Sequence, residues 1–161
     1  HDVGKVAISD TILKKPARLD PAEYEIMKTH TYLGARLFAV SHSDFDEASA
    51  QVALSHHERW DGNGYPGYIN VMTGQCLPGY ETGDGKAVGR KGEEIPPFGR
   101  LVAIADVYDA LSSQRVYKEA WDHVQVLDEL RKERGKHFDP EMIDAFFTAL
   151  DSIIAVGKRY V

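Results

Sequence analysis

Residues 100–111 read RLVAIADVYDAL, and this stretch decides the fold class. Its apolar side chains fall on almost every side of a helix, which is typical of a central, buried helix. They are Leu101, Val102, Ile104, Ala105, Val107, Tyr108 and Leu111. Asp106 lies among them, and burying even a neutral polar group without a partner costs about 2–7 kcal/mol. We therefore expect Asp106 to bind a metal ion, with an arginine salt bridge or a backbone cap as the alternatives.

Capping signals predict further helices on both sides of this one. Asp20-Pro21-Ala22-Glu23 combines an aspartate cap, proline in the first turn and a glutamate three residues after the cap. Asp139-Pro140-Glu141 repeats this signal, and Asp122 is another cap. The expected helices span about residues 21–40, 45–59, 97–111, 122–134 and 140–157. The sequence thus predicts an all-α fold with residues 1–161 as one domain.

Residues 62–92 differ from the rest of the chain. They hold 9 glycines in 31 residues, with no helical period and little alternation of apolar and polar residues. A loop of this length is unusual in a compact domain, and such loops are functional or mobile. We expect a long glycine-rich loop between two helical regions.

Composition narrows the class of protein. The formal net charge of −6 argues against a general nucleic-acid-binding surface, so no duplex nucleic acid is expected as a partner. The single cysteine, Cys76, excludes an internal disulfide and suits a reducing compartment. No apolar run reaches the ~18 residues of a membrane span, and no signal peptide is visible. We expect a cytoplasmic protein.

Imidazoles and carboxylates recur at spaced positions along the chain. They are His1, Asp2, His30, His56, His57 and Asp106. Such ligands without thiolate favour iron, manganese or zinc used for hydrolysis. His56 and His57 project about 100° apart on a helix, so each is expected to serve one metal of a pair. Asp2 can bridge two cations, and the alternative is hydrogen-bonded structural histidines.

Three cations accompany this series. Lys5 follows Asp2 by three residues, and Arg115 and Lys118 follow Asp106 by nine and twelve. Beside a polyvalent metal site they could hold the oxygens of a phosphodiester, although exposed cations are usually solvated. Asp109 is expected to orient a ligating histidine.

Several long motifs support a family resemblance. Residues 1–5 (HDVGK), 56–66 (HHERWDGNGYP), 92–111 and 115–118 (RVYK) resemble the signatures of the HD-GYP family. These are the bacterial phosphodiesterases within the HD metal-dependent phosphohydrolase superfamily, and the match spans essentially the whole chain. The resemblance implies an HD-domain helical bundle that hydrolyses cyclic di-GMP to linear pGpG and in some members on to GMP.

The resemblance also implies roles for individual residues. His1, Asp2, His30, His56, His57 and Asp106 would bind two or three divalent metal ions, iron or manganese in preference to zinc, nickel or magnesium. Asp2, Lys5 and Asp106 would form the catalytic group. Lys5, Arg115, Lys118 and Tyr65 would contact the substrate. The turn Gly64-Tyr65-Pro66 would lie near the site and is implicated in contacts with diguanylate-cyclase domains.

The chain departs from the family pattern in two places. A further histidine ligand, with a glutamate ahead of it in trinuclear members, has no counterpart here, and we expect helices before His1 to be missing. About twenty extra residues, from about 68 to 91, separate the Tyr-Pro turn from the Glu-Glu-Ile-Pro segment. This insertion is expected to be a lid, a partner contact or a disordered segment.

Three alternatives to cyclic di-GMP hydrolysis stay open. A catalytically silent module would bind the dinucleotide or dock a cyclase without cleaving. A di-iron site of the same superfamily would activate oxygen. A phosphodiesterase for another cyclic dinucleotide, such as cyclic GMP-AMP, would keep the chemistry and change the base. The sequence leaves metal identity and number, the upstream domain and the oligomeric state open, a homodimer included.

Overall fold

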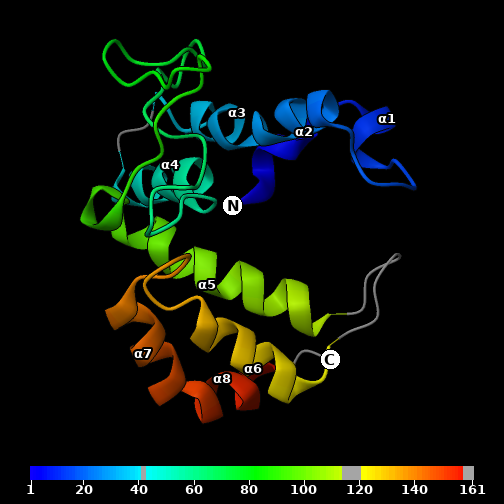
Figure 1. Cartoon of the computed structure of the whole chain (residues 1–161), viewed down its shortest axis with the longest axis vertical. Coiled ribbons are helices and arrows are strands. Elements are labelled where there is room, and N and C mark those ends of the chain that lie inside the picture. The colour runs from blue at the N-terminus through cyan, green and yellow to red at the C-terminus, as the bar shows by residue number, and fades with distance from the viewer. Residues whose placement is uncertain (41–42, 114–120, 158–161) are drawn as a thin grey trace.

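The computed structural model describes residues 1–40, 43–113 and 121–157 of the chain, and within these ranges the regular elements are helices (Figure 1). The all-α prediction is confirmed for this part of the chain. The elements are η1 (Asp2–Ala7), α1 (Asp10–Leu13), α2 (Pro21–Lys28), α3 (His30–Arg36), α4 (Asp44–Ser55), η2 (Gly92–Glu94), α5 (Pro97–Ser112), α6 (His123–Lys132), α7 (Pro140–Thr148) and α8 (Leu150–Gly157). No helix in the described ranges is long and apolar enough to cross a membrane.

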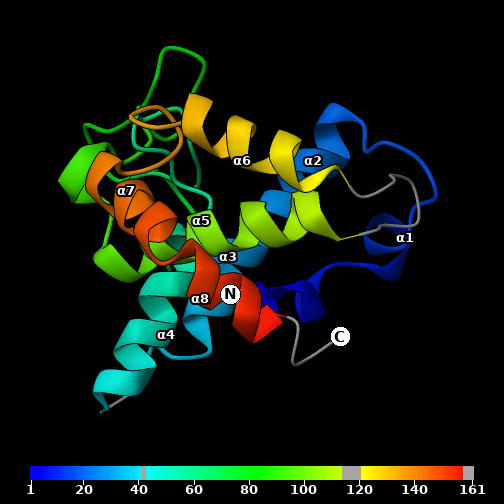
Figure 2. The same ribbon diagram turned by 90° about the horizontal axis from the view of Figure 1, so that it is seen from below.

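Helix α5 lies between two groups of helices. On one side α4 packs against it, and α3 packs against both α4 and η1 (Figure 1). On the other side α6 and α7 contact α5, and Figure 2 shows them flanking it together with α8. The apolar core of the second group is fully buried and comprises Ile104, Val126, Leu130, Phe138 and Ile143. The position of α5 is therefore central, as its composition predicts.

One flank of α5 nevertheless faces solvent, so the prediction of burial on almost every side is wrong. Phe98 is 50% exposed and Leu101 is 55% exposed, while Ala103 on the opposite flank is buried. An apolar groove of about 550 Å³ runs along the exposed flank, between α5 and the last two helices. The side chain of Asp106 lies near the edge of the buried region and is 24% exposed.

Two predicted helices are each divided in two. The helix expected over residues 21–40 breaks at Thr29 and ends at Arg36, which places His30 at the first position of α3. The helix expected over residues 140–157 breaks at Ala149. At or next to each break a threonine hydroxyl donates to an earlier carbonyl, Thr29 to Ile26 at 2.7 Å and Thr148 to Asp144 at 3.0 Å. Such back-bonding competes with the helical ladder and bends helices.

The glycine-rich segment is non-helical as predicted, and it is folded onto the helices. Isolated antiparallel bridges join Ile69 to Cys76 and Glu81 to Ala87. The Tyr68 and Tyr80 rings stack with centroids 4.0 Å apart. Arg36 on α3 donates from Nε to the carbonyl of Val71 at 2.7 Å.

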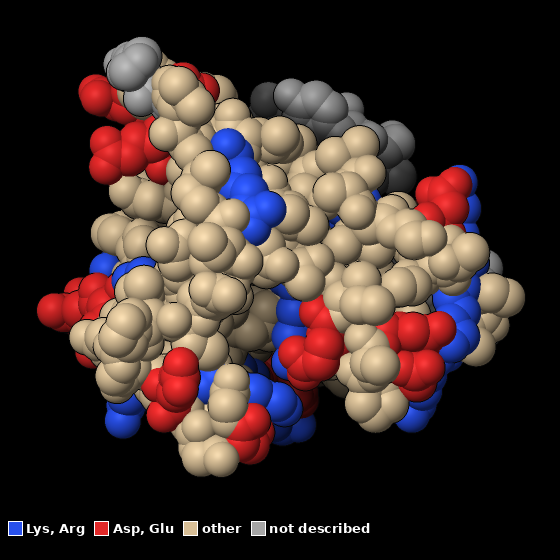
Figure 3. All heavy atoms as spheres, turned by 90° about the horizontal axis from the view of Figure 1, so that it is seen from above, with Lys and Arg blue, Asp and Glu red and all other residues tan. Residues whose placement is uncertain are grey.

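On the face seen in Figure 3, acidic and basic side chains are interspersed.

A glycine lets the first element approach α3 closely. A Cβ at Gly4 would lie 1.9 Å from the carbonyl oxygen of His30 and 2.4 Å from the backbone nitrogen of Gly34. Real Cβ contacts are never this short, so only glycine permits the contact. The contact holds Asp2, in η1, beside His30, at the start of α3.

We predict that Gly4→Ala destabilises the protein and weakens metal binding. The methyl group cannot be accommodated without moving η1 away from α3, and such overpacking costs about 1–3 kcal/mol or more. Thermal unfolding should show a Tm lower by roughly 2–4 °C for each kcal/mol. Gly83→Ala is the matched control, because no atom lies within 4 Å of the Cβ that it adds. Equal Tm values for the two variants would contradict the proposed role of the contact.

Candidate metal centre

Four segments of the chain bring the predicted ligands together. His1 precedes η1 and Asp2 begins it, while His30 begins α3. His56 and His57 follow α4, which ends at Ser55, so the prediction that this helix continues to Arg59 is wrong at its end. Asp106 lies on α5. The side chains meet where the first helical group faces the central helix.

The inner part of the site is a cluster of one carboxylate and three imidazoles. Each of Asp2, His30, His56 and His57 offers one ligand atom, and these atoms lie within 4.8 Å of one another. His30 Nε2 is 3.4 Å from His56 Nε2, and Asp2 Oδ1 is 3.4 Å from His30 Nε2 and 3.8 Å from His56 Nε2. Such a donor set could hold a divalent transition metal ion. The structure places His56 and His57 in this one cluster. Their adjacent positions on a helix predict instead that each binds a different metal ion.

Asp2 connects this cluster to His1 and Asp106. Asp2 Oδ2 lies 3.5 Å from His1 Nε2, which is also 3.5 Å from Asp106 Oδ1. Asp2 Oδ1 is buried and has no hydrogen-bond partner in the described part of the chain. A buried carboxylate oxygen without a partner is costly, and a cation would remove that cost. The residues therefore fit a metal site, with Asp2 shared between two groups of ligands.

The local electrostatics keep the imidazoles neutral. Burial lowers the pKa of His30 and of His56, and burial together with these two neighbours lowers the pKa of His57 to about 3. The Nδ1 atoms of His30 and His56 lie 2.7 Å and 3.0 Å from the carbonyls of Met27 and Val52. Donation from Nδ1 to these carbonyls leaves the Nε2 lone pair directed at the cluster, as metal ligation requires.

Lys5 lies against the cluster. Its Nζ donates to Asp2 Oδ2 at 2.5 Å, and both side chains are more than a third exposed. Burial opposes ionisation of Asp2, but the hydrogen bond and charge of Lys5 outweigh it and hold the pKa of Asp2 below its usual value. Asp2 is therefore ionised at neutral pH.

The structure does not place every predicted residue at the site. Arg115 and Lys118 lie outside the described residues. Asp109 is exposed and accepts a hydrogen bond from Ser113 Oγ at 3.1 Å, so the prediction that it orients a histidine is wrong. Tyr65 is at the site, because its ring stacks on that of His57 with centroids 4.7 Å apart and an interplanar angle of 28°.

Glu58 contributes to the site in a way that sequence reasoning misses. It is 2% exposed, and each of its oxygens accepts a backbone N–H, from Gly67 at 2.6 Å and from Arg90 at 3.1 Å. Gly67 and Arg90 lie at the two ends of the glycine-rich segment. Burial raises the pKa of Glu58 to about 7, against the effect of these two bonds. The signal that the sequence offers is its position directly after His56 and His57, within the motif at residues 56–66.

Comparisons with known proteins identify the family of the chain. The model of the HD domain family matches residues 1–111. A cyclic di-GMP phosphodiesterase of Vibrio cholerae is 38% identical over 165 residues, covering 99% of this chain and 29% of that protein. A 3'3'-cGAMP-specific phosphodiesterase 2 of the same organism is 37% identical over 156 residues, covering 97% and 26%. The cyclic di-GMP phosphodiesterase response regulator RpfG of Xanthomonas campestris is 42% identical over 145 residues, covering 90% and 33%. The chain spans about a quarter to a third of the length of these relatives.

We predict that Asp2→Asn lowers the affinity for manganese or iron by roughly tenfold or more, because the amide lacks the charge and one ligand oxygen of the carboxylate. Metal content after dialysis against a graded chelator series measures the change. Asp10→Asn, at an exposed aspartate on α1, is the matched control. If Asp2→Asn retained the metal content of the parent, the cluster would not be the metal site.

We predict that Glu58→Ala loosens the segment between Gly67 and Arg90. Each N–H left without a partner costs about 1–3 kcal/mol, and opening becomes roughly tenfold more frequent for each 1.4 kcal/mol. Limited trypsin digestion should cleave faster after Lys86, Arg90 and Lys91. Glu93→Ala, at an exposed glutamate of η2, is the control. Equal cleavage rates in the two variants would show that Glu58 does not hold the segment.

Proposed function

The chain belongs to the HD domain family, and we propose that it hydrolyses a phosphodiester bond of a cyclic dinucleotide. The observation that carries the proposal is the buried Asp2 oxygen facing two neutral imidazoles, a site suited to a cation that activates hydrolysis. Cyclic di-GMP is the proposed substrate and linear pGpG the product, with further cleavage to GMP as a second step. The likeness of the motifs to the HD-GYP group supports this choice.

The proposed metal ligands are His1, Asp2, His30, His56, His57 and Asp106. When bound, divalent cations supply an acidified water and neutralise charge on the phosphoryl oxygens. Two or three ions are proposed, iron or manganese before zinc, nickel or magnesium, because imidazole and carboxylate ligands suit these metals. The one cysteine of the chain, Cys76, is not among these proposed ligands, and it lines a pocket beside the cluster.

Lys5 is proposed to act on the substrate phosphate. Its ammonium group is held by Asp2 at the edge of the cluster and its side chain is 37% exposed, so it can reach a phosphoryl oxygen or the leaving oxygen. Asp2 has a second role here, since it orients the lysine. Arg115 and Lys118 are proposed as additional phosphate contacts on the strength of the family resemblance.

A second candidate substrate is cyclic GMP-AMP. The relative that is specific for this dinucleotide is as similar as the cyclic di-GMP phosphodiesterase from the same organism, at 37% and 38% identity. Both candidates keep the same phosphodiester chemistry and differ in one base. Docking of a diguanylate-cyclase domain on Gly64-Tyr65-Pro66, a cytoplasmic location and a homodimer stay predictions.

We predict that the full-length, metal-loaded protein converts cyclic di-GMP to pGpG and that Asp106→Ala reduces turnover by at least about a hundredfold, the scale of losing one charge-stabilising group. Chromatography of the products measures both. Asp109→Ala, one turn further along α5 and exposed, is the matched control and should keep full activity. No turnover of any cyclic dinucleotide would favour the silent binding module, and full activity of Asp106→Ala would remove that residue from the site.

A further inference from the structure

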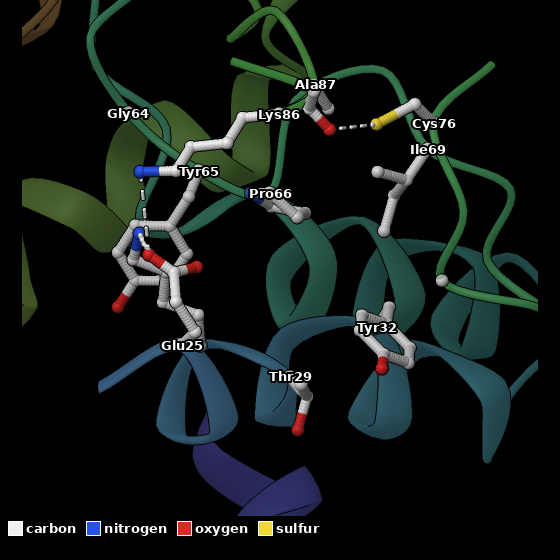
Figure 4. Close-up of a pocket in the computed structure, with 13 residues that line it drawn as sticks. Glu25, Thr29, Tyr32, Gly64, Tyr65, Pro66, Ile69, Cys76, Lys86 and Ala87 are labelled. Atoms are coloured by element: carbon white, nitrogen blue, oxygen red, sulfur yellow. Dashed lines mark hydrogen bonds and ion pairs between the residues drawn. The ribbon is translucent and has the colours of Figure 1, made fainter. Parts of the chain in front are cut away.

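A pocket of about 330 Å³ lies beside the metal centre, between the α2–α3 helices and the glycine-rich segment (Figure 4). This volume is at the lower end of the range of about 300–1,000 Å³ that is usual for ligand sites. The helices contribute Glu25, Lys28 and Tyr32, and the segment contributes Tyr65, Pro66 and Lys86.

The pocket adjoins the cluster through two residues. Thr29 lines the pocket and immediately precedes His30. Tyr65 also lines it, and the same ring stacks on His57. A substrate whose phosphate lies at the cluster would therefore have its adjoining nucleoside near this pocket.

The far wall of the pocket is held in place by packing on α3. Gly74 lies so close to Tyr32 that an added Cβ would be 2.7 Å from the Tyr32 ring carbon Cζ. Its φ of 75° is a second reason for glycine at this position. Arg36, one turn further along α3, donates to the carbonyl of Val71. These contacts make the pocket a preformed feature, which lowers the cost of ordering a ligand in it.

Charged groups of both signs gather at the pocket wall. Glu25 Oε1 is 2.8 Å from Lys28 Nζ and 3.9 Å from Lys86 Nζ. Lys28 Nζ also lies 5.4 Å from the centroid of the Tyr65 ring. In the part of the chain that the structure describes, both ion pairs of Glu25 use Oε1, so Oε2 keeps its lone pairs for a ligand.

We propose that this pocket binds one base of the cyclic dinucleotide and that Glu25 selects guanine over adenine. The inference rests on the proposed function and assigns its base specificity. A carboxylate only accepts hydrogen bonds. The Watson–Crick edge of guanine presents N1–H and the N2 amino group side by side as donors, whereas adenine presents an acceptor at N1. Glu25 therefore matches guanine and opposes adenine.

The remaining groups of the pocket suit the same base. Lysine ammonium groups donate to the O6 and N7 acceptors of guanine, a role open to Lys28 and Lys86. A phosphate is a poorer match, because the Glu25 carboxylate lies between the two lysines and would repel it.

The test compares substrates within one variant. We measure kcat/KM of the metal-loaded, full-length protein for cyclic di-GMP and cyclic di-AMP, in the parent and in Glu25→Gln. The glutamine amide can donate to the adenine N1, so the preference for the guanine substrate should fall by about tenfold or more. Glu93→Gln, at an exposed glutamate of η2 that is not among the residues lining the pocket, is the matched control and should leave the ratio unchanged.

The substrate ratio separates specificity from structural damage. A variant that loses activity on both dinucleotides equally, with the ratio intact, would overturn the assignment of Glu25. If the parent protein turns over no cyclic dinucleotide, the proposed function fails, and calorimetric Kd values for the same two ligands then test the pocket alone. A Kd ratio that Glu25→Gln lowers by about tenfold supports the guanine site, and an unchanged Kd ratio overturns it.

Discussion

The rest of the structure depends on one carboxylate held against two buried imidazoles. Asp2 reaches His30 and His56 only because the backbone of Gly4 touches that of His30 and Gly34. The same carboxylate reaches outward to Lys5 and His1, and His1 reaches Asp106 on α5. Asp2 belongs to the first helical group and Asp106 to the central helix, so a cation bound at this centre would neutralise carboxylates from both groups.

A second buried carboxylate, that of Glu58, extends the order of the site into the glycine-rich segment. His57 stacks on Tyr65 and is followed by Glu58, which binds the backbone at both ends of the segment. The glycine-rich segment is thereby hydrogen-bonded to Glu58, the residue that follows the candidate metal ligand His57. The segment behaves as a wall of the site, and its attachment to α3 through Arg36 and Gly74 places a pocket between them.

Sequence reasoning succeeds where the signal is local and fails where it is tertiary. The Asp20 capping box is present with both of its hydrogen bonds, and the Asp122 and Asp139 caps are made as predicted. The breaks at Thr29 and Ala149 are missed because a hydroxyl competing for one carbonyl barely alters a helical pattern. The Gly4 contact and the Glu58 bonds join segments far apart in sequence, so no periodicity reveals them. The predicted ligands do converge, but which of them share one cluster emerges only from their positions.

The meeting of His1 and Asp106 has a consequence for how the chain assembles. These residues lie within 3.5 Å and are separated by more than a hundred positions. Closing so long a loop carries an entropic cost that local contacts cannot repay early in folding. An ion that binds only the completed cluster adds RT ln(1 + [L]/Kd) to the stability of the native state. The ion would then act as a reversible cross-link between η1 and the central helix α5. The concentration of free metal ion would set how much this cross-link stabilises the native state.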